Sequence, residues 1–131
     1  MSGTLLDTSV LIAFDDGESF ELPAEAAISV ITLGELRAGV ARARDADSRA
    51  ARQARLTAVR MAFAPLNVDE AVAEHYGDAL AHARNAGRIV KATDLLIIAT
   101  ARAAGRALHT LDRAQARLAR DLGLAVSGDG A

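Results

Sequence analysis

Four acidic residues stand beside apolar stretches of the sequence, in places where the chain can hold a carboxylate at the edge of a core. They are Asp7, Glu35, Asp94 and Asp112. Carboxylates gathered at one point repel one another and resist ionisation, a conflict that a hard divalent cation removes. Sites built only of oxygen ligands select Mg²⁺ or Mn²⁺, which can activate water and stabilise charge on a phosphoryl oxygen. The four acids therefore indicate metal-assisted hydrolysis of a phosphate ester.

Each acid also has a purely structural interpretation. Asp7 and Asp112 can cap the helices that follow them, because a side-chain oxygen accepts the unpaired N–H groups of a first helical turn. Glu35 completes a capping-box pattern that begins at Thr32. Asp94 suits the first turn of a helix, where the helix dipole favours an acid. Only the joint placement of the four favours a shared site over four separate caps.

Two hydroxyl residues lie next to these acids. Thr8 follows Asp7, and either Thr8 or Ser9 offers a cap for the first helix. Thr110 lies two residues before Asp112, so in a strand both share one face, where the hydroxyl could donate to a carboxylate or a phosphate. An ordinary strand threonine is the alternative. The chain has no cysteine, no Gly-rich phosphate loop and no Gly-x-Ser-x-Gly turn at Ser9, so no side-chain nucleophile is evident.

Short apolar stretches alternate with helical ones along the chain. Strands are expected at 4–6, 26–31, 66–68, 107–111 and 124–126, and helices that end near residues 14, 42, 63, 87, 105 and 122. This alternation predicts a mostly parallel sheet of four or five strands in a three-layer α/β/α domain. In such a sheet the carboxyl ends of the strands form the rim where ligands bind. The chain 1–131 is expected to be one domain, with 127–131 as a frayed tail.

Charge is distributed unevenly over the 131 residues, whose net charge is −2. Between residues 37 and 64 seven arginines stand against two aspartates, a net charge of +5, so the rest of the chain carries −7. This segment, with Arg37, Arg42 and Arg44 at its start, could guide a phosphate backbone to an acidic site; a solvated helix face is the alternative. No apolar stretch approaches the roughly 18 residues of a membrane helix, and no signal segment is evident. We therefore expect a cytoplasmic protein.

Four short stretches, each with one of the acids, carry a family resemblance. They are LDTSVLI at 6–12, SVITLGEL at 29–36 followed by Gly39, DLLIIA at 94–99 and TLD at 110–112. In this order and spacing they resemble the PIN-domain ribonucleases, and most closely the VapC-type toxins of type II toxin–antitoxin pairs. The resemblance implies a PIN-like fold and a Mg²⁺-dependent endoribonuclease, with Mn²⁺ able to substitute. Its substrate would be single-stranded or looped RNA, either transfer or ribosomal RNA.

The resemblance also implies roles for individual residues. The metal-binding and catalytic acids would be Asp7, Glu35, Asp94 and Asp112, supported by Thr8 and Thr110. The family often has an aromatic residue soon after its fourth acid, whereas this chain continues with Arg113-Ala114-Gln115-Ala116. A homodimer is implied too, together with a small VapB-like antitoxin whose C-terminal segment blocks the acidic pocket. The basic residues at 37–60 would line either the antitoxin groove or the RNA path.

The leading hypothesis is therefore a toxin that hydrolyses RNA with a metal-activated water. One alternative is a non-catalytic binding module with an acidic pocket, like a receiver domain. Another is a PIN nuclease that acts in RNA processing rather than as a toxin. A haloacid-dehalogenase type of phosphatase is disfavoured, because Asp7 lacks the second aspartate two residues later that such enzymes use as an acid.

Overall fold

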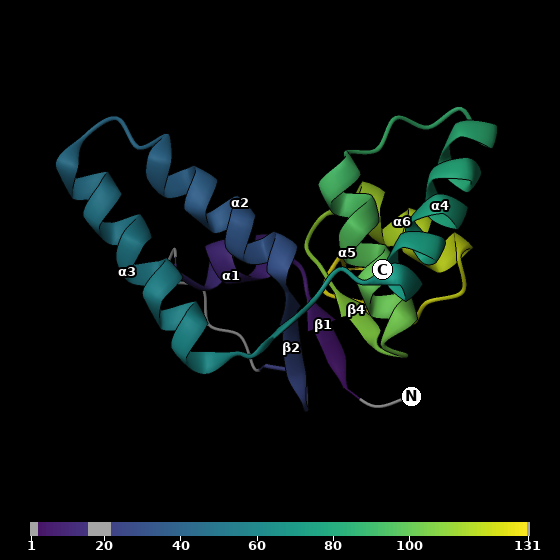
Figure 1. The fold of residues 1–131 in the computed structure, drawn as a ribbon, viewed down its shortest axis with the longest axis horizontal. Helices are drawn as coiled ribbons and strands as arrows, with labels where there is room; N and C mark the ends of the chain where they lie inside the picture. The colour runs from purple at the N-terminus through teal and green to yellow at the C-terminus, as the bar shows by residue number, and fades with distance from the viewer. Residues whose placement is uncertain (1–2, 16–21, 131) are drawn as a thin grey trace.

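The computed structural model describes residues 3–15 and 22–130, which form alternating strands and helices (Figure 1). The elements are β1 (Thr4–Leu6), α1 (Thr8–Asp15), β2 (Ala26–Ser29), α2 (Val30–Ala41), α3 (Ala46–Ala62), β3 (Pro65–Leu66), α4 (Glu70–Asn85), α5 (Ala92–Ala103), β4 (Ala107–His109), α6 (Arg113–Asp121) and β5 (Val126–Ser127). None of the helices in these two ranges is long and apolar enough to cross a membrane.

The strands form one five-stranded sheet in the order β3-β2-β1-β4-β5. Every neighbouring pair is parallel, and the central strand β1 places Thr4 opposite both Ala26 and Ala107. The expected parallel sheet is thus confirmed, with β1 at its centre. Because all five strands run the same way, their carboxyl ends share one edge of the sheet, and β1 delivers Asp7 to the middle of that edge.

Both faces of the sheet are covered by helices. Successive residues of a strand point to opposite faces, and accordingly Leu5 belongs to one apolar cluster and Leu6 to another. The first cluster packs α4, α5 and α6 on the sheet, and the second packs α1, α2 and α3 (Figure 1). Leu5 and Leu6 are both fully buried. The three-layer α/β/α architecture expected from the sequence is therefore confirmed.

Helix α2 begins earlier than the sequence suggested. The expected strand 26–31 ends at Ser29, whose side chain caps α2 by accepting a hydrogen bond from the N–H of Ile31 (3.0 Å). The capping box of Thr32 and Glu35 is therefore wrong, because Thr32 is fully buried inside the helix. The earlier cap outweighs the strand preference of the β-branched residues that follow it.

Smaller differences concern the ends of other elements. The sequence favours Asp47 or Ser48 as the cap of α3, but in the structure Asp45 caps it by accepting from the N–H of Ser48. Strand β3 is Pro65–Leu66, and β5 lies two residues later than expected, at Val126–Ser127. The sequence Asp15-Asp16-Gly17-Glu18 favours an acidic loop, but Asp15 is the last residue of α1, and 16–18 lie outside the described residues.

The C-terminal residues form part of the fold, contrary to the frayed tail expected at 127–131. Ser127 pairs with β4, and the buried carboxylate of Asp129 accepts two hydrogen bonds from the guanidinium of Arg120, at 2.6 and 2.8 Å. Gly128 adopts a positive φ of +97°, and a Cβ there would lie 2.7 Å from the carbonyl oxygen of Thr110. The ion pair and this close approach hold the segment 127–129 beside β4, and Ala131 lies outside the described residues.

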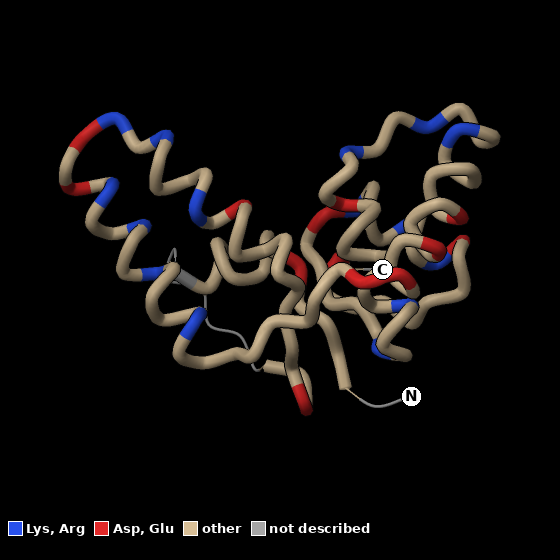
Figure 2. Tube along the Cα trace, in the orientation of Figure 1, with Lys and Arg blue, Asp and Glu red and all other residues tan. Residues whose placement is uncertain are grey.

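Helices α2 and α3 form an antiparallel pair that projects beyond the sheet (Figure 1), and we call it the α2–α3 arm (30–62). Basic residues lie along both helices of the arm (Figure 2). Two hydrogen bonds hold its helices together at the outer end: Arg49 donates to the carbonyl of Ala43 (2.9 Å), and Arg52 donates to the carbonyl of Gly39 (2.7 Å). The basic segment 37–64 therefore forms one projecting structure.

Candidate active site

Asp7 lies at the carboxyl end of the central strand. Its backbone N–H donates to the carbonyl of His109 (2.9 Å), which continues the pairing of β1 with β4. The side chain is only 5% exposed, and its carboxylate accepts hydrogen bonds from two N–H groups and lies against one hydroxyl. Oδ2 faces the N–H of Ser9 (3.1 Å) and the hydroxyl of Thr110 (3.3 Å), and Oδ1 faces Nε2 of Gln115 (3.1 Å). All three groups are neutral, so the carboxylate is oriented without being paired to a cation.

The hydrogen bond from Ser9 is the kind of helix cap that we considered for Asp7, so the structural interpretation of this residue also holds. Neither of the two hydroxyls expected to cap α1 does so. The hydroxyl of Ser9 instead accepts from the N–H of Leu111 (3.1 Å), and that of Thr8 donates to Oε1 of Glu35 (2.6 Å). The two hydroxyls thus tie the start of α1 to the segment after β4 and to α2.

Glu35 is half-buried in the second turn of α2, facing Thr8. Thr8 is 7% exposed and lies 3.0 Å from the buried hydroxyl of Thr32, so it is held between the two side chains. The short hydrogen bond from Thr8 fixes Oε1 of Glu35. The sequence predicted Thr8 as a residue that supports Asp7, whereas in the structure its hydroxyl supports Glu35.

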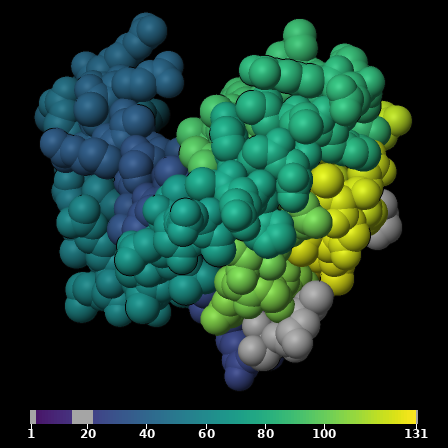
Figure 3. Space-filling model, turned by 45° about the vertical axis from the view of Figure 1, so that its right-hand side comes forward, coloured from purple at the N-terminus to yellow at the C-terminus, as the bar shows by residue number. Residues whose placement is uncertain are grey.

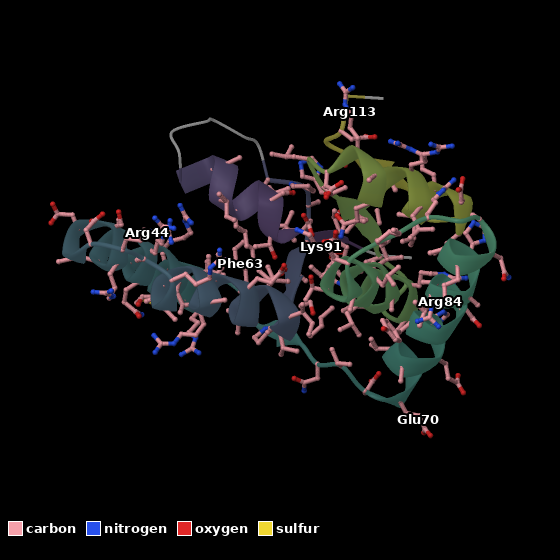
Figure 4. All side chains as sticks on the ribbon, turned by 90° about the horizontal axis from the view of Figure 1, so that it is seen from above. Arg44, Phe63, Glu70, Arg84, Lys91 and Arg113 are labelled. Carbon is pink, nitrogen blue, oxygen red and sulfur yellow. The ribbon has the colours of Figure 1, made fainter. Side chains whose placement is uncertain are left out.

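Asp94 is the third residue of α5, and its half-buried carboxylate makes no hydrogen bond within 3–15 and 22–130. Burial, together with the negative charges of Asp7, Asp112 and Glu35, raises its pKa from 3.8 to about 6, while Lys91 opposes the rise. Figure 4 shows Lys91 near the middle of the molecule, where α5 begins. Asp7, Glu35 and Asp112, which are far from Asp94 in the sequence, therefore lie close enough to act on its charge.

Asp112 caps α6. Its Oδ1 accepts from the N–H of Gln115 (3.1 Å), while Oδ2 has no hydrogen-bond partner in the described part of the chain. The cap that we considered for Asp112 is therefore present, and one oxygen remains available at the rim. Thr110, fully buried beside it, accepts from the N–H of Asp112 (3.1 Å) and donates to Oε1 of Gln115 (2.7 Å).

Gln115 is the main residue of this site that the sequence did not reveal. Its side chain is 1% exposed and contacts both Asp7 and Thr110. One signal was available, because Gln115 precedes the buried Leu118 and Ala119 by three and four residues and so shares their helix face. An amide on an apolar face indicates a buried hydrogen-bonding partner.

The chemistry of these side chains fits a hard divalent cation. The donors are carboxylate oxygens, and in the described residues none of the four acids forms an ion pair with an arginine or lysine. The carboxylates do not already converge as ligands, since the described residues contain no group of three acidic or histidine side chains at metal-binding spacing. Asp7 and Glu35 are instead directed toward their own amide and hydroxyl donors. A cation would have to draw together carboxylates that now repel one another.

The basic arm borders this rim. Glu35, Gly39, Arg52 and Arg55 line a hollow of about 470 Å³, and Gly39 and Arg52 also line a neighbouring hollow of about 420 Å³ together with other residues of the arm. Together the two hollows are lined by α1, α2, α3 and the turn between α2 and α3, and an open notch separates the arm from the part of the molecule that carries α4 and α5 (Figure 3). The two hollows form a path from Glu35 outward along the arm.

The arginines predicted to contact RNA or antitoxin lie at different places on the arm. Arg42 and Arg44 are exposed and line the outer hollow, and Figure 4 shows Arg44 at the far end of the arm. Arg37 is exposed on α2 and lines neither hollow. Two of the three therefore border the path.

A model of the PIN domain matches residues 4–121, which include all four acids. The chain belongs to the PIN-domain family. This PIN domain is 44% identical over 100 residues to Ribonuclease VapC8 of Mycobacterium tuberculosis, covering 74% of this chain and 88% of that protein. It is 40% identical over 110 residues to Ribonuclease VapC5 of the same organism, covering 82% of this chain and 79% of the relative.

Solved structures agree with this assignment. VapBC-5 of Mycobacterium tuberculosis, a member of the VapBC family of toxin–antitoxin systems, superposes with a TM-score of 0.81 at 35% identity and covers 96% of both chains. FitAcB of Neisseria gonorrhoeae superposes with a TM-score of 0.73 at 28% identity, covering 95% of this PIN domain and 96% of its own chain. The predicted resemblance is confirmed, and membership among the PIN ribonucleases implies a requirement for a divalent metal.

Proposed function

We propose that this PIN domain is a Mg²⁺-dependent endoribonuclease and the toxic component of a toxin–antitoxin pair. The observation that carries the proposal is the set of four carboxylates at one edge of the sheet. The negative charges of Asp7, Glu35 and Asp112 raise the pKa of Asp94, and in the described residues none of the four forms an ion pair with an arginine or lysine. The names of the VapC relatives support the reaction, and the VapBC structures support the toxin role.

The proposed ligands of the metal are Asp7, Glu35 and Asp94, with Asp112 assisting through its free oxygen. When bound, the metal supplies an activated water and stabilises charge on the phosphoryl oxygen. Ser9 and Gln115 hold Asp7 still. Mg²⁺ suits this set because it prefers oxygen ligands in a fixed geometry, and Mn²⁺ can replace it.

The proposed partners are single-stranded or looped RNA, either transfer or ribosomal, and a VapB-like antitoxin. A second copy of the chain completes a homodimer, and the cytoplasm is where such an RNA would be met. VapBC-5 is a member of the VapBC family of toxin–antitoxin systems, which supports the antitoxin partner. Arg37, Arg42 and Arg44 are proposed to contact RNA phosphates or the antitoxin.

The test is to express the chain alone, without an antitoxin, and to assay the purified protein on RNA with Mg²⁺. Wild type should arrest growth and cleave RNA, and Asp7→Asn should do neither while remaining folded, because the change removes a charged ligand and keeps the side-chain shape. The matched control is Asp78→Asn on the exposed face of α4, which should behave as wild type.

The outcomes separate the alternatives. If Asp7→Asn cuts RNA at the wild-type rate, the proposed metal mechanism is refuted. Growth arrest without cleavage of any RNA would favour a non-catalytic acidic-pocket module. Cleavage without growth arrest would favour a PIN nuclease of RNA processing.

A further inference from the structure

Gln115 is a polar side chain in an apolar place. It is the third residue of α6 and is 1% exposed, and the nearby Ala116, Leu118 and Ala119 on the same helix are fully buried. Burying an amide costs free energy unless its hydrogen bonds are made. The partners of Gln115 therefore explain why the position holds an amide.

The amide of Gln115 joins several elements at the rim. Nε2 donates to Oδ1 of Asp7 (3.1 Å) and to the backbone carbonyl of Asp94 (3.4 Å), and Oε1 accepts from the hydroxyl of Thr110 (2.7 Å). A carboxylate and a carbonyl only accept, so the NH₂ group must be the end that faces them. Both hydrogens and the oxygen of the amide are used, which gives the side chain a single orientation.

The bonds of Gln115 connect two of the acids proposed to bind metal. Asp7 ends β1 and Asp94 begins α5, and one NH₂ group touches both, although 21 residues separate Gln115 from Asp94 and 108 separate it from Asp7. This pair of hydrogen bonds fixes the end of β1 relative to the start of α5. The distance between the Asp7 and Asp94 carboxylates therefore depends on these two hydrogen bonds.

The neutrality of Gln115 matters as much as its position. An arginine or lysine there would also orient Asp7, but it would neutralise the carboxylate and compete with a divalent cation. An amide directs the carboxylate and leaves its negative charge in place. The N–H of Ser9, which also donates to Asp7, and the hydroxyl of Thr110, which lies 3.3 Å from Oδ2 of Asp7, are neutral as well.

We infer that Gln115 is a positioning residue, which holds the carboxylate of Asp7 beside the start of α5 so that Asp7 and Asp94 bind the same divalent cation. This inference rests on the proposed function. Gln115 acts through Asp7 and need not touch the metal or the RNA. Groups of this kind, which hydrogen-bond a metal ligand, typically change metal affinity about 10- to 100-fold when removed.

The decisive variant is Gln115→Met, which keeps a long side chain and removes the amide. Mn²⁺ binding is measured without RNA, by the loss of the free-ion electron paramagnetic resonance signal during titration. We expect the Mn²⁺ Kd to rise about tenfold or more, with the far-ultraviolet circular dichroism spectrum unchanged. The matched control is Gln53→Met at an exposed position of α3, which should leave the Kd as in wild type.

A second readout separates positioning from a general packing defect. In cleavage assays, Gln115→Met should need about tenfold more Mn²⁺ for half-maximal rate and should recover most of its rate at saturating Mn²⁺. A protein damaged only in its core would lose rate at every metal concentration. An unchanged Mn²⁺ Kd in folded Gln115→Met would overturn the inference.

A measurement on the wild-type protein keeps the inference testable if Gln115→Met fails to fold. In metal-free wild type, the side-chain NH₂ of Gln115 should give nuclear magnetic resonance signals that exchange slowly with water, and Asp7→Asn should shift them strongly. Signals that exchange as fast as those of Gln53 would refute the geometry. Wild type that binds no Mn²⁺ and cuts no RNA would instead refute the proposed function, whatever the amide signals show.

Discussion

The raised pKa of Asp94 predicts that the metal-free protein gains stability when this acid is neutralised. The change is Asp94→Asn, which keeps the shape of the side chain and removes its charge. Burial and the three other acids raise the pKa of Asp94 from 3.8 to about 6. At about 1.4 kcal/mol for each tenfold change in proton affinity, this rise corresponds to about 3 kcal/mol for a group shielded from solvent. Asp94 is half-buried, so screening reduces the figure to about 1–2 kcal/mol.

The sign of the effect follows from proton linkage. Below pH 3.8 Asp94 is protonated in both the folded and the unfolded chain, so it costs nothing. Between pH 3.8 and about 6 the folded chain holds the proton and the unfolded chain has lost it, so stability falls as the pH rises. Above pH 6 the full cost is present. Wild type should therefore lose about 1–2 kcal/mol over this window that Asp94→Asn does not lose.

The assay is thermal unfolding without divalent metal, at pH 7 and at pH 4.5. A chain of this length changes its Tm by roughly 4 °C per kcal/mol, so Asp94→Asn should melt roughly 4–8 °C above wild type at pH 7 and closer to it at pH 4.5. The exposed Asp78→Asn should match wild type at both values. A Tm of Asp94→Asn at or below that of wild type at pH 7 would refute the reasoning.

Three further predictions concern the metal, the tail and the arm. Mg²⁺ at ten times its Kd should stabilise wild type by about 1.4 kcal/mol and should stabilise Asp94→Asn much less; equal shifts in Tm would contradict a role for this acid. Gly128→Ala should lower the urea midpoint far more than Gly130→Ala, since both glycines have positive φ but only at 128 would a Cβ meet the carbonyl of Thr110. Changing Arg42 and Arg44 together to glutamine should weaken RNA binding. The slope of the logarithm of the RNA binding constant against the logarithm of the salt concentration should become shallower by about 0.7 for each phosphate that the variant no longer neutralises. If RNA affinity is unchanged and antitoxin binding is weaker, both arginines contact the antitoxin instead.

The layout of the site could be predicted because it depends on local patterns. Apolar stretches place Asp7 and Asp112 after strands, and a parallel sheet brings such positions to one edge. Asp94 was predictable from the apolar helix that it begins, α5. These features depend on sequence within a few residues and on a general rule of sheet topology.

What escaped prediction depends on partners distant in sequence. The role of Thr8 was set by Glu35, which is 27 residues away, and that of Gln115 by Asp7, which is 108 residues away. Nothing near either residue specifies these pairings. The tail 127–131 was expected to fray, but the ion pair of the buried Asp129 with the partly exposed Arg120 holds it. The start of α2 was missed for a local reason, since Ser29 and Thr32 were both acceptable caps.

The position of β1 at the centre of the sheet has a consequence for how the protein is made. Leu6 pairs with His109, and the carboxylate of Asp7 meets Gln115, 108 residues further along the chain. At about 5–20 residues per second, a ribosome needs roughly 5–20 s to synthesise that interval. During this time Asp7 already exists, but the groups that orient it do not. A truncated or stalled product that ends before α6 therefore cannot assemble the rim, so the acidic centre is completed only near the end of translation.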